Sequence, residues 1–227
     1  MKSDPARVTI HYAQTLDGRI ATRSGHSQWI GGEASLRLAH ELRAGHAAVM
    51  VGVGTVLADN PRLTTRLVAG PSPARVVVDS RLRLPLQAAV LQDNAAPTII
   101  ATTRAAPADR RGAIAALGAR IVDVEPDENG RVDLASLVDR LAVEGLTSVL
   151  IEGGAGLITS ALRQGIAERV LVCIAPKVVG AGIEAVGPLE IDRLSDALTF
   201  QEARFTPLGD DLIFEGRLAP RTRAGAA

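Results

Sequence analysis

The stretch that decides the fold is AAVMVGVGTVLADNPRLTTR, residues 47–66, in which an apolar run gives way to turn-forming and charged residues. Residues 47–55 are apolar at successive positions, which is typical of a strand covered on both faces in a parallel sheet. Asn60 and Pro61 then form a pair that favours a turn. We therefore expect a buried strand over 47–55 that opens into a loop carrying a carboxylate and two arginines.

Strands and helices alternate on either side of this stretch. The segment EASLRLAHELRA, residues 33–44, has the apolar spacing of a helix, and Gly45 is expected to end it. Further strands are expected at 74–80, 98–103, 120–125, 147–152 and 169–180, and further helices at 111–119, 133–145 and 157–165. Residues 198–219 alternate around the turn PLGDD and predict an antiparallel hairpin. The pattern predicts an α/β fold, with a mainly parallel central sheet, helices on both faces and a C-terminal hairpin.

The whole chain has 227 residues, of which 25 are Lys or Arg and 25 are Asp or Glu, so its formal net charge is zero. A balanced chain with few aromatic residues is a poor candidate for binding nucleic acid. One cysteine excludes an internal disulfide and a multi-cysteine zinc site, and the histidines have no metal-ligand spacing. We expect one domain over 1–219, a disordered tail over 220–227, no metal, no membrane span and a cytoplasmic location.

A glycine-rich segment, IEGGAGLITSAL, occupies residues 151–162 between an expected strand and an expected helix. Glycines allow the backbone to approach a ligand closely, and free N–H groups at a helix N-terminus favour phosphate. The segment lacks the third glycine of the dinucleotide fingerprint, so a Rossmann domain is disfavoured. A plain strand–helix turn explains the glycines equally well, and Glu152 within it is either a ligand group or a solvated charge.

Arginines and hydroxyl groups accompany several expected strand ends. Arg66 could bind a phosphate through two nitrogens, and Arg43 at the end of the preceding helix could join it. The pairs Ser80–Arg81 and Thr103–Arg104 (the latter following Thr102) each suit a ribose 2′-phosphate. The alternative for all of these residues is an ordinary polar loop, and the alternative for Trp29 is the core.

Seven motifs in order make the chain recognisable: TLDGRIA, SGHSQWI, ELRA, GVGTVLADNPRLTTR, RVVVDS, LIEGGAGL and VCIAPKVVG. Together they resemble the reductase domain of the riboflavin-biosynthesis deaminase/reductase family, which is similar in fold to dihydrofolate reductase. The resemblance runs from about residue 7 to residue 217. In bacteria this domain usually follows a zinc deaminase, so the chain resembles a stand-alone reductase or an excised domain.

The resemblance implies NADPH-dependent reduction of 5-amino-6-(5-phosphoribosylamino)uracil to its ribityl product, because the SQWI segment looks more like the bacterial type. Archaeal and fungal relatives reduce the diaminopyrimidine that has not been deaminated, which is the alternative substrate. A module that binds the nucleotide without catalysis is a third possibility from another class. Members of the family commonly form homodimers, and we expect one here.

The resemblance also assigns residues to each ligand. Asp59 and Glu152 are the expected catalytic groups, with Asp59 acting in hydride geometry and proton delivery. One departure is Asn60, where relatives often have a second aspartate. The substrate is expected to contact Ser27, Arg43, Leu63, Arg66 and Glu152. NADPH is expected to contact Ala13, Trp29, Thr55, Asp59, Ser80, Gly154, Ala155, Gly156, Leu157, Ile158, Thr159 and Ser160.

Overall fold

The computed structural model describes residues 6–220, which form one nine-stranded sheet with a separate two-stranded sheet beside it. The order across the large sheet is β10-β11-β8-β1-β7-β3-β4-β5-β6. The strands are β1 (Arg7–Thr15), β2 (Arg19–Thr22), β3 (Ala48–Gly52), β4 (Ala74–Val78), β5 (Thr98–Thr102), β6 (Arg120–Asp123), β7 (Ser148–Gly153), β8 (Arg169–Ala175), β9 (Gly182–Glu184), β10 (Phe200–Leu208) and β11 (Asp211–Leu218). From residue 221 onward, the expected tail lies outside the described residues, and the single domain over 1–219 remains a prediction.

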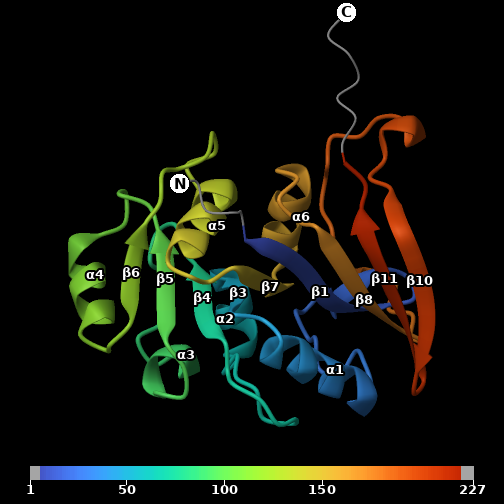
Figure 1. Cartoon of the computed structure of the whole chain (residues 1–227), viewed down its shortest axis with the longest axis horizontal. Coiled ribbons are helices and arrows are strands. Elements are labelled where there is room, and N and C mark those ends of the chain that lie inside the picture. Colours follow the sequence, from blue (N-terminus) through green and yellow to red (C-terminus); the bar gives the residue numbers. More distant parts are fainter. Residues whose placement is uncertain (1–5, 221–227) are drawn as a thin grey trace, which may run out of the picture.

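Strands β8, β1, β7, β3, β4, β5 and β6 run parallel, whereas β11 is antiparallel to β8 and β10 to β11 (Figure 1). The C-terminal hairpin therefore extends one edge of the parallel sheet, as the sequence predicts. Parallel strands all end at the same edge, so the segments that follow β1, β3, β4 and β7 leave the sheet close together. That edge is where ligands bind in open α/β sheets.

Helices cover both faces of the sheet. They are α1 (Glu33–Ala44), α2 (Val53–Asp59), α3 (Ala89–Gln92), α4 (Ala108–Ala115), α5 (Leu134–Val143) and α6 (Ala155–Arg163), with a 3-10 turn at Leu194–Asp196. Alternate residues of one strand enter opposite cores: Met50 joins the core under α5 and α6, and Val51 joins the core that includes α2, α3 and α4. Burial on both faces explains the nearly continuous apolar strands.

The structure corrects several details of the predicted elements. The strand expected over 169–180 ends at Ala175, and the helices expected at 111–119 and 157–165 lie at Ala108–Ala115 and Ala155–Arg163. The strand expected over 47–55 ends at Gly52, and Val53–Asp59 forms helix α2, with Val53 and Val56 buried. Packing of these two valines, three residues apart on a helix, outweighs the strand preference of a Val-Gly-Val-Gly-Thr segment. The polar segment after β1 also contains β2, which pairs with the distant β9 and forms the small sheet.

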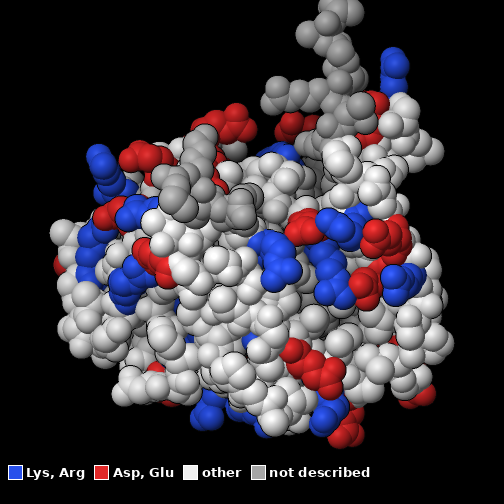
Figure 2. All heavy atoms as spheres, in the orientation of Figure 1, with Lys and Arg blue, Asp and Glu red and all other residues white. Residues whose placement is uncertain are grey.

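Acidic and basic side chains are interspersed on the face of the molecule shown in Figure 2. Within the described residues, no helix is both long enough and apolar enough to cross a bilayer.

Candidate functional site

One cavity of about 1120 Å³ lies at the carboxyl-terminal edge of the parallel strands. It is lined by the ends of β1, β3, β4 and β7, by the starts of α2 and α6, and by the loop that precedes α1. Fifteen of the predicted site residues line it: Ala13, Ser27, Trp29, Arg43, Thr55, Asp59, Arg66, Ser80, Glu152, Gly154, Ala155, Gly156, Leu157, Ile158 and Ser160. Residues distributed over most of the chain thus meet in a single hollow.

Two predicted site residues are not among the residues that line this cavity. The side chain of Leu63 belongs to the core and is 2% exposed, which leaves its backbone for the expected substrate contact, and that contact stays a prediction. Thr159 is also buried, and its hydroxyl donates to the Ala155 carbonyl at 2.6 Å and accepts from the Gly187 N–H at 2.8 Å. The hydroxyl of Thr159 therefore fixes a neighbouring loop, and the structure does not place it in a phosphate cradle.

Arg43 and Glu152 form a buried bidentate ion pair between α1 and the end of β7. The Nε and Nη2 nitrogens of Arg43 donate to the two carboxylate oxygens of Glu152, each at 2.6 Å. Their side chains are only 12% and 8% exposed. Because Glu152 occupies two nitrogens of the guanidinium, Arg43 does not present that fork to a phosphate.

Arg66 lies next to this pair. The Nη1 of Arg43 and the Nη1 of Arg66 both donate to the Thr64 carbonyl, at 3.2 and 3.3 Å, so the two guanidiniums converge. Burial and the nearby charge of Arg43 lower the pKa of Arg66. Among the described residues no carboxylate pairs with Arg66, so its charge is available to an anion in the cavity.

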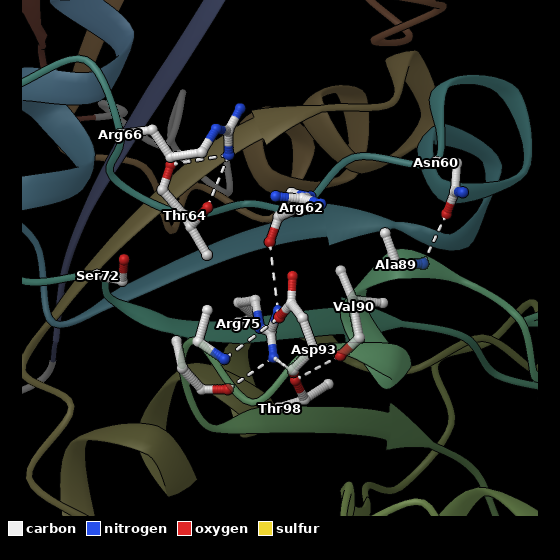
Figure 3. A network of polar contacts seen from close by, with 12 residues as sticks. Asn60, Arg62, Thr64, Arg66, Ser72, Arg75, Ala89, Val90, Asp93 and Thr98 are labelled. Carbon is white, nitrogen blue, oxygen red and sulfur yellow. Dashed lines mark hydrogen bonds and ion pairs between the residues drawn. The ribbon is translucent and has the colours of Figure 1, made fainter.

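The loop from Asn60 to Arg66 is anchored from beneath (Figure 3). The buried Arg75 of β4 donates to the carbonyl of Arg62 at 3.4 Å and also pairs with Asp93. At one end of the loop, the side chain of Asn60 accepts from the Ala89 N–H at 2.7 Å. At the other end, the Arg66 N–H donates to the Nδ1 of His40 at 2.9 Å. The position of Arg66 is therefore set by the scaffold.

Asp59 and Ser27 meet across the cavity mouth, although 32 residues separate them in the chain. The Ser27 hydroxyl donates to the Oδ1 of Asp59 at 2.9 Å. Asp59 is the last residue of α2, and Asn60 after it adopts a left-handed conformation with φ of 43°. Among the described residues the Oδ2 of Asp59 has no hydrogen-bond partner, so this oxygen is available to a ligand in the cavity.

The N-terminus of α6 forms another wall of the cavity. Its N-cap is Gly154, with φ of 88° and no side-chain cap. A Cβ on Gly154 would lie 3.2 Å from the Oγ1 of Thr55, so glycine allows the α6 and α2 segments to approach closely. The first N–H groups of α6 are uncapped, which is an arrangement that binds phosphate in other proteins.

Trp29 is 68% exposed and lies on the cavity wall rather than in the core. Its loop is held on two sides. The Nζ of Lys177 donates to the carbonyls of Trp29 and Ile30, at 2.7 and 2.8 Å. The buried Asp211 accepts from the Gly32 N–H at 2.7 Å. The indole therefore has a fixed backbone and a free face.

His11 is a cavity residue that the sequence reasoning missed. It follows Ile10, which pairs in register with Ile151, so it lies beside Glu152 on adjacent strands. It is 6% exposed, and its Nε2 has no hydrogen-bond partner among the described residues. The pKa of His11 is lowered to about 4, mainly by burial. The negative charge of Glu152 raises this pKa, and the positive charge of Arg43 lowers it further. The neutral imidazole therefore offers one unpaired nitrogen, a feature that no local motif indicates.

Two other expectations from the sequence are also resolved. The second hydroxyl–arginine pair is not part of the cavity, because Thr103 is buried and Arg104 is exposed and faces Glu125 at 3.6 Å. Cys173 is buried, as expected, and lies against the cavity, where burial raises the pKa of its thiol to about 11. Within residues 6–220, no cluster of His, Cys, Asp or Glu could hold a metal ion.

Comparisons with known proteins agree with this geometry. The sequence profile described as the RibD C-terminal domain matches residues 6–214. The chain is 44% identical to the 2,5-diamino-6-ribosylamino-4(3H)-pyrimidinone 5′-phosphate reductase of Methanothermobacter thermautotrophicus, covering 92% of this chain and 96% of that protein. It is 34% identical to the riboflavin biosynthesis protein RibD of Aquifex aeolicus, covering 91% of this chain but only 56% of the relative.

A solved structure shows the same fold. Acinetobacter baumannii RibD superposes with a TM-score of 0.81 at 27% identity, over 95% of this chain and 58% of that one. The chain thus spans nearly the whole of this archaeal reductase and little more than half of each of these two bacterial proteins.

Proposed function

The chain belongs to the RibD C-terminal domain family, and on that premise we propose that it uses NADPH to reduce the ribose of a 5-phosphoribosylamino pyrimidine to a ribityl chain. The single observation that supports this most strongly is the convergence of Arg66, Asp59 and the uncapped α6 N-terminus on one cavity. Membership makes the protein an oxidoreductase of riboflavin biosynthesis, which implies a nicotinamide cofactor.

Two substrates are candidates. The archaeal relative, which matches over nearly its whole length, is named for the 2,5-diamino pyrimidinone phosphate, and that favours the diaminopyrimidine. A Thermotoga maritima structure at 27% identity is named as a deaminase/5-amino-6-(5-phosphoribosylamino)uracil reductase, and that name and the SQWI segment favour the uracil. The two compounds share the phosphoribosyl group and differ in the ring, so assays of each with NADPH decide between them.

The residues of the cavity fit a nicotinamide dinucleotide. The uncapped α6 N-terminus (Gly154–Gly156) suits its pyrophosphate, and Gly154 leaves room where a Cβ would meet Thr55. The exposed indole of Trp29 offers a flat apolar surface, with Ala13 and Thr55 on the same cavity wall. When bound, the cofactor supplies a hydride to the sugar carbon.

Arg66 is the proposed anchor for the substrate phosphate. It is positioned by His40 and Thr64 and has no carboxylate partner among the described residues. The pair of Arg43 and Glu152 supports it, since Arg43 holds the same Thr64 carbonyl and Glu152 balances its charge. We propose that Glu152 contacts the substrate from this fixed position.

Asp59 is the better proposed proton-handling group. Both oxygens of Glu152 already accept hydrogen bonds from Arg43, so neither is free to exchange a proton with the substrate. Asp59 has one free oxygen, and Ser27 orients the other. A carboxyl group so placed can exchange a proton with the substrate as its ribose ring opens.

The variant Asp59→Asn tests this role. We expect kcat to fall by about 100-fold or more, since general acid–base groups contribute on that scale, and we expect the pH profile of kcat to flatten. Asp139→Asn, on the exposed side of α5, serves as the control and should leave kcat unchanged. Near-normal kcat with an unchanged pH profile in Asp59→Asn would contradict the role.

A nucleotide-binding module without catalysis remains the alternative from another class. It would bind NADPH and turn over neither pyrimidine, and the reductase would oxidise NADPH when given one of them. A homodimer and a cytoplasmic location also remain predictions.

A further inference from the structure

A buried polar cluster lies behind the cavity wall that carries Trp29, and the proposed function does not use it. Its centre is the carboxylate of Asp211, the first residue of β11, which is 5% exposed and is not among the residues that line the cavity. We propose that Asp211 is a positioning residue, which holds segment 29–32 and the start of α1 and so fixes the wall of the cavity that faces the cofactor. This inference rests on the proposed function, in which Trp29 contacts NADPH.

One oxygen of Asp211 joins the loop before α1, the first turn of α1, and β8. The Oδ2 of Asp211 accepts from the Gly32 N–H at 2.7 Å and from the Ser35 hydroxyl at 2.6 Å. The thiol of Cys173 in β8 lies 2.9 Å from the Ser35 Oγ and 3.3 Å from the same Asp211 oxygen, and it can donate to either. Three separate segments of the chain therefore meet at a single carboxylate from the C-terminal hairpin.

The carboxylate of Asp211 also caps α1. The N-cap of α1 is Gly32, which has no side chain to accept from the free N–H groups of the first turn. In a capping box, the side chain at the third helical position accepts from the N-cap N–H. That position is Ser35 here, and Asp211 supplies the acceptor from 179 residues away. Burial raises the pKa of Asp211, but its hydrogen bonds outweigh this effect and lower the pKa, so the carboxylate stays charged beside the positive end of the helix.

The C-terminal hairpin packs closely behind this wall. Ile213 pairs in register with Cys173, which keeps the start of β11 beside the end of β8. The turn before β11 approaches the first turn of α1, because a Cβ on Gly209 would lie 3.6 Å from the Cβ of Ala34. Gly31 covers the thiol of Cys173, because a Cβ on Gly31 would lie 3.1 Å from its Sγ. Movement of the wall away from the hairpin would therefore uncover this thiol.

The bonds of Asp211 act on one wall of the cavity and not on the other. Lys177 holds segment 29–32 at its start, and Asp211 holds it at its end. The far end of α1 is fixed separately, because Arg43 is bound to Glu152. Loss of the Asp211 carboxylate should therefore loosen the wall that faces the cofactor and leave the proposed phosphate-binding end in place.

The experiment compares Asp211→Ala with Asp211→Asn and Asp210→Ala. Every bond to the Asp211 side chain goes to one oxygen, which the amide of an asparagine can replace. In Asp211→Ala we expect the fluorescence anisotropy of Trp29 to fall. The Kd for NADPH, from calorimetric titration, should rise about tenfold, the scale of one hydrogen bond to a charged group, and KM for the pyrimidine should stay within about twofold. Asp211→Asn should restore most of the NADPH affinity. Asp210 is the exposed neighbour in the same turn, and Asp210→Ala should match the wild type.

The single cysteine of the chain gives a second readout that needs no ligand. Cys173 is 1% exposed, and burial raises the pKa of its thiol to about 11, with a contribution from the charge of Asp211. Modification by dipyridyl disulfide should be at least about tenfold faster in Asp211→Ala than in Asp211→Asn. Both variants remove the charge, so the difference between their rates measures the opening of the wall.

Wild-type anisotropy and thiol reactivity in a folded Asp211→Ala would overturn the inference, as would equal rises in the Kd for NADPH and the KM for the pyrimidine. Failure of Asp211→Asn to restore NADPH affinity would also overturn it. Circular dichroism shows whether the variants fold. If Asp211→Ala does not, Ser35→Ala takes its place, because it removes one donor of the cluster and should change anisotropy and thiol reactivity in the same direction. Wild-type values for Ser35→Ala would then overturn the inference.

The proposed function is tested separately by oxidation of NADPH in the presence of each pyrimidine. Turnover by the wild type, with unchanged NADPH affinity in Asp211→Ala, leaves the function standing and overturns the positioning role. Binding of NADPH that weakens in Asp211→Ala, without turnover of either pyrimidine by the wild type, leaves the positioning role standing and overturns the function.

Discussion

The two ends of the cavity are built on opposite principles. At the Glu152 end, charged groups are buried and already bonded to one another: Arg43 to Glu152, both Arg43 and Arg66 to Thr64, and His40 to the Arg66 backbone. At the other end, the lining residues Arg81 and Arg131 are exposed and their side chains have no partner among the described residues, and the N-terminus of α6 is uncapped. The charged groups at the Glu152 end are therefore fixed by bonds within the protein, whereas the hydrogen-bond donors at the other end are available to a ligand.

This difference indicates where a substitution should cost stability and where it should cost binding. Buried pairs cannot lose one partner without leaving an uncompensated charge, so changes at the Glu152 end should affect folding and activity together. Exposed, unpaired arginines contribute little to folding, so changes at the Arg81 and Arg131 end should affect binding alone. The predictions below test that division, beginning with the largest effect.

Glu152→Gln should destabilise the protein by about 3 kcal/mol or more, because it leaves Arg43 charged and unpaired in a buried site. Urea unfolding measures the change. Glu144→Gln is a matched control, since Glu144 also forms a bidentate pair with an arginine, Arg120, but with side chains 30% and 49% exposed. That pair should contribute less than about 1 kcal/mol. Equal losses in both variants would contradict the division between the two ends.

Gly154→Ala should destabilise the protein by about 1–3 kcal/mol and weaken NADPH binding. Its φ of 88° strains any other residue, and the added Cβ would lie 3.2 Å from Thr55. Gly118→Ala is the control, with φ of 84° and nothing within 4 Å of the added Cβ. Because both glycines have a similar φ, the difference between the two variants in unfolding free energy and NADPH affinity measures the effect of the contact between the added Cβ and Thr55. Equal values for the two variants would show that this contact affects neither stability nor binding.

The stability of the protein should fall as the pH drops from about 6.5 toward 4. Burial lowers the pKa values of His11 and His40 to about 4, so the folded state resists protonation that the unfolded state accepts near 6.5. Burying His11 and His40 in their neutral form therefore contributes its full stability above pH 6.5. This contribution is lost as the pH falls from about 6.5 to about 4. For His11→Asn we expect the loss between pH 7 and pH 5 to shrink by about 1–2 kcal/mol, measured by urea unfolding at each pH. An unchanged pH dependence would show that His11 does not titrate in this way.

Lys177→Met should have the smallest effect, a rise of about two- to fivefold in KM for NADPH, because it removes one of the two clamps on the Trp29 loop. The chain has a single tryptophan, so the anisotropy of its fluorescence reports this loop directly and should fall. Asp211 keeps the second clamp in place, which limits the effect. Unchanged anisotropy would mean that Lys177 does not hold the loop.

Much of the fold can be predicted from local patterns. Helix α1 has the predicted bounds, because leucine spacing and Gly45 act within one segment. The parallel strands and the hairpin follow from apolar runs and a turn motif. Helix α2 could not be found in this way, because it depends on the tertiary packing of Val53 and Val56. The pairing of β2 with β9 could not be found either, because the two strands are about 160 residues apart in the chain.

The site residues that belong to a recognisable motif could be predicted from the sequence. Interactions between residues far apart in the chain could not. The motif match brought Asp59, Arg66 and the α6 segment to one cavity, as the structure has them. It could not show that Arg43 is paired with Glu152, which lies 109 residues away, or that Leu63 faces the core. The unpaired nitrogen of His11 likewise depends on what surrounds it in three dimensions.

The most direct test of the central claim is the pair of Michaelis constants of Arg66→Ala, measured for the phosphorylated pyrimidine and for NADPH in one steady-state assay. If Arg66 binds the substrate phosphate at one end of the cavity and the cofactor occupies the other, KM for the pyrimidine rises about tenfold or more and KM for NADPH stays within about twofold. A rise in KM for NADPH as large as that for the pyrimidine, or no change in either, would contradict the division of the cavity between the two ligands.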